Sequence, residues 1–475
     1  MANALTNSAR YRILCARDRR FDGKLFFGVK TTGIYCRPIC PARTPLERNV
    51  VYFASAAAAE EAGLRACLRC RPETSPGTPA WLGTCATVSR ALRLMSSGAA
   101  DERSLPEIAQ RLGVTERHLR RLFVEHVGAP PLAVMLVRRL DFARQLVDHS
   151  CISFSEIAFT AGFGSVRRFN SAYKQRFRRS PTQTRALRTG KIDAVKSTFP
   201  LSYRPPIQMR ALFDFLKARA IAGAEFAQEA FYRRTFNLGS GPGYFEIRPD
   251  EINARVLLTV SGGTSRDLVE VVRRVRGLLD LEADPLAVAN HLGADPILRP
   301  LLKARPGLRV PGCWDGFELA VRAILGQQVS VAGARTLARR VVEKFGEKVA
   351  FENVPELTHV FPSAQRLARA DLSGLGITGS RVKAIPALAK AVCEKKVRLD
   401  VDADPAQMRT ALLELPGIGP WTTEYIALRA LRDPNAFPDT DLVLKRAIER
   451  HGVQSAADTW QPWRAYAAHY LWDSL

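Results

Sequence analysis

Four cysteines near the amino terminus constrain this chain more than any other feature. Cys36 and Cys40 lie in the segment Cys-Arg-Pro-Ile-Cys, and Cys67 and Cys70 lie in Cys-Leu-Arg-Cys. Two short thiol pairs separated by a longer loop are typical of a tetrahedral zinc site, because each pair holds one side of the metal. The spacing predicts a small domain folded around one Zn²⁺. Judged by spacing alone, such a site is more often structural than reactive.

Length and charge set the class of protein. The chain has 475 residues, too many for one compact core, so we expect two to four domains. The net charge is +24, and residues 1–190 carry +17 of it, from 31 Lys+Arg and 14 Asp+Glu. Most of this excess is arginine, which suits bidentate contacts with phosphate, so double-stranded DNA is the expected partner. The alternative is a solubilising surface without a polyanion partner.

The expected location follows from what the sequence does not contain. No run of about 18 apolar residues occurs, so we expect no membrane span and no membrane partner. The first 20 residues lack the apolar segment of a secretory signal. We therefore expect a cytoplasmic, nucleoid-associated protein. Its thiols would stay reduced there, which favours metal ligation over disulfides for the four cysteines.

Two breaks divide the chain. The first is a linker marked by Pro72, Pro76, Gly77 and Pro79, and the second covers residues 191–206. Between them, from Trp81 to about Arg188, the pattern is helical. After the second break we expect helices over 209–221 and 265–279, strands over 244–247 and 254–260, and then helices from Pro311 onward. The predicted fold class is multidomain, mainly α with α+β parts.

The helical segment contains an internal near-repeat. Residues 104–113 are similar to 153–162, and each stretch reads as a short helix with a serine cap that ends at glycine. A second helix follows each one, over 116–125 and 166–178, which is the helix-turn-helix plan. Two plain helical hairpins are the alternative, but they would not need basic residues on both second helices. Base-reading candidates on these helices are Arg117, His118, Arg120, Arg121, Arg167, Arg168, Asn170, Lys174 and Arg176.

A second group of candidate residues lies near the carboxyl terminus. Gly417 and Gly419 form a Gly-x-Gly turn in Leu-Pro-Gly-Ile-Gly-Pro-Trp-Thr, which would let backbone amides approach a DNA phosphate. Asp439 and Asp441 follow in Phe-Pro-Asp-Thr-Asp-Leu. Either carboxylate could serve in catalysis or cap the helix that follows.

Two resemblances cover the amino-terminal part. Residues 84–188, with Gly-Phe-Gly-Ser165, Phe169, Phe177 and Ser180-Pro181, resemble an AraC-type DNA-binding domain. Residues 10–73, with Thr-Thr-Gly-Ile-Tyr-Cys-Arg-Pro-Ile-Cys40, resemble the zinc-binding methyl-acceptor domain of the Ada family. This resemblance implies that Cys36 takes a methyl group from a DNA phosphotriester. The formal charge of a zinc site with four thiolates would fall from −2 to −1, and we hypothesise that this raises affinity for a promoter.

A third resemblance covers residues 199–475. The stretches 305–312, 317–330 and 460–466 resemble AlkA-type helix-hairpin-helix DNA glycosylases, which act on 3-methyladenine. This implies a catalytic Asp441, with Asp439 as the second choice, and Gln328 where relatives insert an apolar wedge into DNA. Trp421 occupies the position of the lysine in strand-cleaving relatives, so a monofunctional enzyme is implied. No cysteine follows Cys393, so no iron–sulfur cluster is expected. The implied pocket for cationic bases consists of Trp421, Tyr425 and Trp472.

Together these resemblances predict a fusion protein that senses alkylated DNA, activates repair genes with RNA polymerase as a partner, and excises alkylated purines. Two alternatives remain open: a regulator whose carboxyl-terminal half binds DNA without catalysis, and a glycosylase with a purely structural zinc module. The expected domains are Ada-like zinc-binding (1–78), AraC-type helix-turn-helix (82–188), AlkA-like amino-terminal α+β (199–308) and helix-hairpin-helix glycosylase (309–475).

Overall fold

The structure is a computed structural model that describes residues 5–67, 69–70, 72, 75, 86–96, 104–187, 196–377, 379–452 and 459–475. The expected linker residues Pro76, Gly77 and Pro79 lie outside this range. The chain forms two compact units. Unit 1 contains Met1–Pro205, Asp250–Arg273 and Leu281–Asp284, and unit 2 contains Pro206–Pro249, Arg274–Asp280 and Pro285–Leu475.

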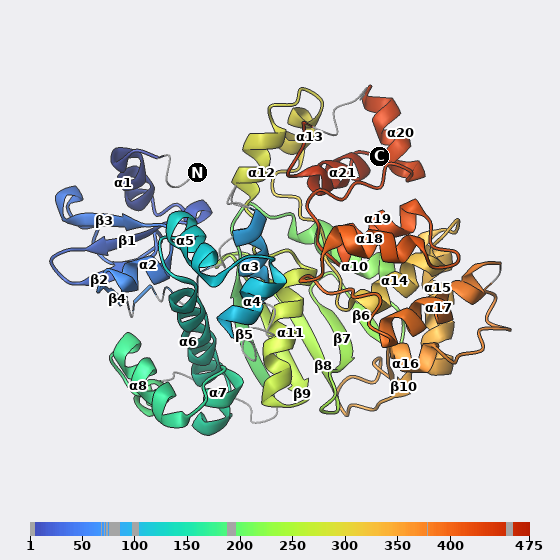
Figure 1. Ribbon diagram of the computed structural model, residues 1–475, viewed down its shortest axis with the longest axis horizontal. Coiled ribbons are helices and arrows are strands. Elements are labelled where there is room, and N and C mark those ends of the chain that lie inside the picture. Colours follow the sequence, from blue (N-terminus) through green and yellow to red (C-terminus); the bar gives the residue numbers. More distant parts are fainter. Residues whose placement is uncertain are drawn as a thin grey trace. The chain divides into compact units, whose positions relative to one another are not determined.

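The amino-terminal domain of unit 1 is built on a four-stranded sheet of order β3-β1-β2-β4 (Figure 1). Strand β1 pairs antiparallel with β2 and β3, and β2 pairs parallel with β4. The core is small, and the four cysteines pack in it beside Leu14, Phe27 and Val50. Such a core needs additional support, which a structural metal can provide. The elements are α1 (Asn7–Cys15), η2 (Arg19–Phe21), β1 (Phe26–Val29), β2 (Ile34–Cys36), η3 (Glu47–Asn49), β3 (Val50–Phe53), α2 (Ala56–Glu61) and β4 (Arg65–Ala66).

The expected helix-turn-helix units are present. Ser104 forms a capping box at the start of α4, Ser153 caps α7, and each short helix is followed by a glycine with positive φ, Gly113 at 70° and Gly162 at 77°. The helices of this region are α3 (Ala86–Ser96), α4 (Leu105–Arg111), α5 (Glu116–Val127), α6 (Pro131–His149), α7 (Phe154–Thr160), α8 (Val166–Phe177) and α9 (Pro181–Ala186).

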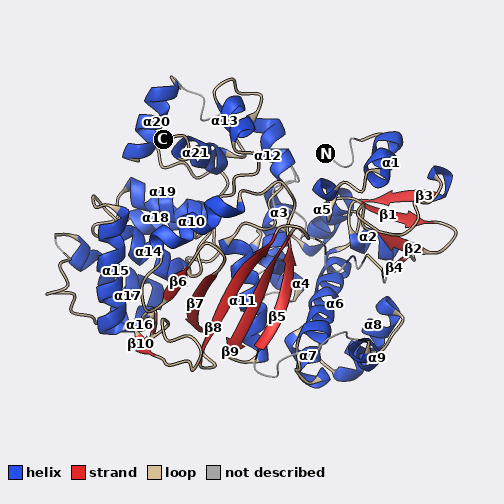
Figure 2. Cartoon of the chain, turned by 180° about the vertical axis from the view of Figure 1, so that it is seen from behind, coloured by secondary structure: helices blue, strands red, loops and turns tan. Residues whose placement is uncertain are grey.

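A five-stranded sheet follows, with the order β5-β9-β8-β7-β6 (strands in red in Figure 2). The expected strands over 244–247 and 254–260 correspond to β8 and β9. Strand β5 lies in the second predicted break, where it pairs antiparallel with β9. Its alternating Phe199 and Leu201 are fully buried, and Pro200 is tolerated because β5 is an edge strand. The elements are β5 (Lys196–Ser202), α10 (Met209–Arg219), β6 (Glu225–Ala227), β7 (Tyr232–Asn237), β8 (Pro242–Asp250), β9 (Arg255–Gly262) and α11 (Ser265–Leu278).

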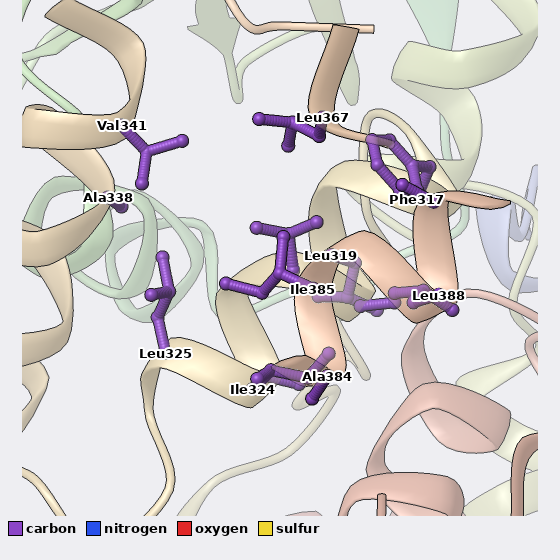
Figure 3. Packing of buried hydrophobic residues seen from close by; sticks show 14 of the residues in the cluster. Phe317, Leu319, Ile324, Leu325, Ala338, Val341, Leu367, Ala384, Ile385 and Leu388 are labelled. Atoms are coloured by element: carbon purple, nitrogen blue, oxygen red, sulfur yellow. The ribbon is translucent and has the colours of Figure 1, made fainter. Parts of the chain in front are cut away.

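The carboxyl-terminal part of unit 2 is helical and centres on α14, which is buried on nearly all sides. Phe317, Leu319 and Ile324 of this helix belong to one buried cluster that also contains Val341 and Ile385 (Figure 3). The helix also buries the charged Glu318, which is paired with Arg234 and Arg322. The elements are α12 (Pro285–Leu292), α13 (Leu298–Ala304), α14 (Gly316–Leu325), α15 (Val331–Phe345), β10 (Glu347–Lys348), β11 (His359–Val360), α16 (Ala364–Leu367), α17 (Arg381–Cys393), α18 (Pro405–Leu413), α19 (Pro420–Arg429), α20 (Leu442–His451) and α21 (Arg464–Trp472).

Within the described residues, we find no helix whose length and apolar character would let it cross a membrane.

Candidate functional sites

The four predicted zinc ligands converge. Cys36 ends β2 and Cys67 directly follows β4, so the parallel pairing of these strands brings the two thiol pairs together. The backbone N–H of Cys67 donates to the carbonyl of Tyr35 at 3.0 Å. All four side chains are buried, and their sulfur atoms lie within 4.8 Å of one another. Zn–S bonds of about 2.3 Å in a tetrahedron place sulfur atoms about 3.8 Å apart, so this donor set fits zinc.

The acidities of the four thiols differ strongly. Hydrogen bonds with Cys36 lower the pKa of Cys40 to about 7 and lower the pKa of Cys67 as well. Hydrogen bonds with Cys40, Cys67 and Cys70, together with burial, raise the pKa of Cys36. Four buried thiols in contact cannot all ionise unless a cation compensates their charge.

Arg37 forms hydrogen bonds with one of the predicted zinc ligands, Cys70. Its backbone N–H donates to Cys70 Sγ at 3.4 Å, and its Nη1 donates to the Cys70 carbonyl at 3.2 Å. The guanidinium also forms a buried ion pair with Asp22, with Nε at 2.7 Å from Oδ1. Such partners behind the ligands fix the orientation of a metal site.

The predicted acid Asp441 lies at the centre of a network of three donors. Its Oδ2 accepts from Trp421 Nε1 at 2.7 Å, and its Oδ1 accepts from Trp472 Nε1 at 3.0 Å. Oδ1 also accepts from the backbone N–H of Leu444 at 2.8 Å, so Asp441 caps α20. The capping and functional interpretations of this residue are therefore compatible. Asp439, the second choice, is exposed.

Asp441 opens onto a cavity of about 540 Å³ in unit 2, whose lining includes all three predicted pocket aromatics. Trp421 and Tyr425 stack with ring centroids 5.4 Å apart and an interplanar angle of 15°. They are four residues apart on α19, so the helix itself aligns their rings. The result is a cavity lined by aromatic side chains with a carboxylate at its edge.

Sequence reasoning missed the charged residues of this cavity. Arg429 Nη1 donates to the Tyr425 hydroxyl at 2.8 Å. Burial would raise the pKa of Tyr425, but the charges of Arg429 and Arg219 outweigh it and lower this pKa. Burial and the same arginines lower the pKa of His469, which also lines the cavity, to about 3. The spacing of Trp421, Tyr425 and Arg429 at four-residue intervals was the available signal.

The Gly-x-Gly turn connects α18 to α19. Gly417 has φ +76°, and an added Cβ would lie 3.0 Å from the Cβ of Ala384, so glycine is required there. Gly419 has an extended conformation and open space, and it is the N-cap of α19. Gln327 donates to the Gly417 carbonyl at 2.9 Å and braces the turn. Gln328 is exposed with φ 54°, next to the exposed Val329.

The base-reading candidates divide into two groups. Arg176 is buried, so its inclusion among the base-reading residues is wrong. Its guanidinium instead lies 2.6 Å from Asp141 and 3.1 Å from Glu60, and it donates to the Tyr35 hydroxyl at 3.4 Å. The other candidates on α5 and α8 remain available for DNA contacts. His118 is half-buried, and the rest are exposed: Arg117, Arg120, Arg121, Arg167, Arg168, Asn170 and Lys174.

Four family models match the chain. They are the metal binding domain of Ada at residues 9–73, a helix-turn-helix domain at 108–187, the AlkA N-terminal domain at 198–315, and the HhH-GPD superfamily of base excision DNA repair proteins at 321–467. The predicted multidomain fold class and all three resemblances are thereby confirmed.

One relative matches nearly end to end. The probable bifunctional transcriptional activator/DNA repair enzyme AlkA of Mycobacterium tuberculosis is 41% identical over 477 residues, covering 98% of this chain and 96% of the relative. This chain belongs to that family. The family joins two kinds of protein, since DNA-3-methyladenine glycosylase 2 of Escherichia coli is 36% identical over 58% of this chain and 96% of its own length. The bifunctional transcriptional activator/DNA repair enzyme Ada of E. coli is 37% identical over 28% of this chain and 36% of its own length.

A solved structure supports the fold of the AlkA-type half. The 3-methyladenine DNA glycosylase from Archaeoglobus fulgidus has a TM-score of 0.50 at 22% identity, covering 58% of this chain and 97% of that one. With the family matches, this establishes a zinc-binding domain, a helix-turn-helix reader of DNA and a glycosylase fold in one chain.

Proposed function

We propose that this protein is a monofunctional DNA glycosylase for alkylated purines of the 3-methyladenine type, a single-turnover acceptor of methyl groups from DNA phosphotriesters, and a transcriptional regulator. One observation supports the glycosylase above the others. The carboxylate of Asp441 is held by two indole N–H groups at the edge of a cavity with aromatic faces. A carboxylate placed beside an aromatic cavity is the arrangement that stabilises positive charge on a sugar as its glycosidic bond breaks.

The cavity suits a flipped base. A base must leave the duplex before its glycosidic bond can be cut, and a cationic alkylated purine gains about 0.5–2 kcal/mol over the face of an indole ring. As the C1′–N bond breaks, its electron pair leaves with the base and positive charge develops on the sugar. The Asp441 carboxylate stabilises that charge. Water then adds to C1′ and releases a proton. Trp421 offers no amine for a Schiff base, so the strand stays uncut.

The cysteine cluster supports the methyl-acceptor role. Cys36, Cys40, Cys67 and Cys70 would hold one Zn²⁺, which keeps the sulfur atoms as thiolates at neutral pH. The Cys36 sulfur attacks the methyl carbon of a phosphotriester, the C–O bond breaks, and its electron pair stays on the phosphodiester anion. The thioether product consumes the acceptor. The four cysteines are 4–8% exposed, so the choice of Cys36 rests on its position as the first cysteine of the Ada-type quartet.

The regulatory role uses the helix-turn-helix units. Loss of one negative charge at the cysteine site reduces repulsion from DNA phosphates, and RNA polymerase is the partner that an activator requires. We further propose domain boundaries at 1–78, 82–188, 199–308 and 309–475, a single zinc, no iron–sulfur cluster, and a place in the cytoplasm on nucleoid DNA.

Duplex DNA methylated on both bases and phosphates tests both chemical roles in one incubation. Chromatography should detect free 3-methyladenine, and peptide mass spectrometry should detect one added methyl group at Cys36. Absence of base release from protein that binds DNA would leave a regulator without catalysis. Absence of methyl at Cys36, in protein with zinc bound, would leave a glycosylase with a structural zinc module.

A further inference from the structure

A loop of the zinc-binding domain meets the AlkA-type region inside unit 1. Lys24 Nζ lies 2.9 Å from both carboxylate oxygens of Asp284, and the two side chains are 7% and 2% exposed. Arg204 is fully buried, and its Nε donates to the carbonyl of Asp22 at 2.9 Å. Its Nη1 donates to the carbonyl of Glu282 at 2.8 Å. Residues 22–24 are thus held by two charged side chains from the AlkA-type region.

These contacts depend on one another because the groups are buried. A buried charge that loses its partner is strongly destabilising, since the remaining charge is left without water or a counter-ion. Loss of either Lys24 or Asp284 from this buried pair should therefore be costly. Arg204 likewise needs carbonyl oxygens from both sides of the junction. Such a junction fixes the position of the loop 22–24.

The same loop supports the cysteine cluster. The Asp22 carboxylate pairs with the guanidinium of Arg37, which directly follows Cys36 in the chain. Arg37 in turn donates to Cys70 through its backbone N–H and its guanidinium. A continuous series of hydrogen bonds thus runs from Arg204 through Asp22 and Arg37 to Cys70.

We propose that Arg204 and Asp284, which belong to the AlkA-type region, are positioning residues for the cysteine site. They hold the loop 22–24 so that Asp22 keeps Arg37 against the metal ligands. The metal site of the first domain then depends on side chains of the glycosylase half. Its zinc retention should fall when those side chains are changed, whether or not Cys36 accepts a methyl group.

The test measures the rate at which zinc passes from the full-length, zinc-loaded protein to a chromophoric chelator. Partners behind metal ligands typically change metal affinity by 10–100-fold. We expect zinc loss to be about tenfold faster in Asp284→Asn and Arg204→Met. The matched controls Asp214→Asn and Arg210→Met change exposed side chains, 59% and 90% exposed, and should release zinc at the wild-type rate. Wild-type release from all four variants would overturn the proposal.

A second comparison separates positioning from general unfolding. Replacing both members of a buried ion pair with apolar residues is often neutral, whereas removing one is costly. The double variant Lys24→Met/Asp284→Met should therefore retain zinc better than either single variant, and additive losses would overturn the proposal.

Five of the six tryptophans lie beyond residue 313, so their fluorescence reports on the AlkA-type half. Zinc loss that occurs only when this fluorescence reports unfolding would also overturn it.

Methyl transfer to Cys36 is a second readout that rests on the proposed function. It should slow in the same variants by a similar factor. If the wild-type protein accepts no methyl group, the acceptor role fails, while the zinc measurement still decides the positioning role.

Discussion

The substitution Asp441→Asn separates the charge of this residue from its structural roles. Asparagine has nearly the same shape, and its side-chain oxygen can still accept from the N–H of Leu444, so α20 keeps its cap. In the wild-type protein, Asp441 Oδ2 accepts a hydrogen bond from Trp421 Nε1 at 2.7 Å. In the variant, the NH₂ group of asparagine takes the place of Oδ2 and faces the same indole N–H. Two donors then face each other, which costs about 1 kcal/mol at this partly buried site.

The effect on catalysis should be far larger. A full negative charge about 4 Å from the developing positive sugar is worth about 4 kcal/mol at an effective dielectric constant of 20. This stabilisation acts in the transition state and not in the bound substrate. Its loss should therefore slow the reaction about 1,000-fold. The variant should therefore remain folded and bind DNA, yet release 3-methyladenine about 1,000 times more slowly.

Single-turnover release of 3-methyladenine from a methylated duplex, with protein in excess, measures this step directly. Asp439→Asn is the matched control because Asp439 is exposed and only two residues away. It should release base at the wild-type rate. A rate for Asp441→Asn within about tenfold of wild type would refute the electrostatic role. A large loss in Asp439→Asn instead would transfer that role to Asp439.

Three further predictions concern other parts of the molecule. Arg176→Met removes a buried guanidinium from its ion pairs with Asp141 and Glu60, and urea unfolding should show about 3 kcal/mol less stability. A loss below about 1 kcal/mol contradicts this. His469 has a folded pKa of about 3, below its unfolded value of about 6.5, so its stabilising contribution is present above pH 6.5 and is lost on acidification. About 2 kcal/mol should be lost between pH 7 and 5 in wild type and not in His469→Phe, as judged by urea unfolding at each pH. If Gln328 fills the gap left by a flipped base, Gln328→Ala should lower the rate of base release about tenfold, equivalent to about 1.4 kcal/mol. Val329→Ala should release base at the wild-type rate. The reverse result would assign the wedge to Val329.

Features that depend only on residues close together in the sequence, such as cysteine pairs and helix caps, could be predicted from the sequence. The cysteine pairs converge because their spacing already places each pair in one turn, and the strand pairing only has to join them. Ser104 and Ser153 begin helices because a serine cap acts within its own turn. The position of Asp441 as a helix cap was likewise predictable from its neighbours in sequence, whereas the choice of Asp441 over Asp439 came from the family resemblance.

Features that depend on partners distant in the chain could not be predicted in this way. Strand β5 lies in a segment read as a break, because a short strand with a proline is defined by its pairing with β9 rather than by its own sequence. Arg219, which lowers the pKa of Tyr425, comes from α10, about 200 positions earlier in the chain, and no local pattern joins the two residues. The contact of Lys24 with Asp284 spans 260 positions, and either residue alone is an ordinary surface charge.

For Arg176, helical periodicity predicts which face of α8 carries the residue, but not which residues it contacts. Phe169, Tyr173 and Arg176 lie at intervals of four and three residues, so they share one face of α8, and the two aromatics are fully buried. That spacing alone excludes Arg176 from the face that carries Arg167 and Asn170. It could not reveal that Arg176 bonds to Tyr35, the residue before Cys36. Helix α8 is therefore joined through its buried face to β2, the strand that ends at Cys36.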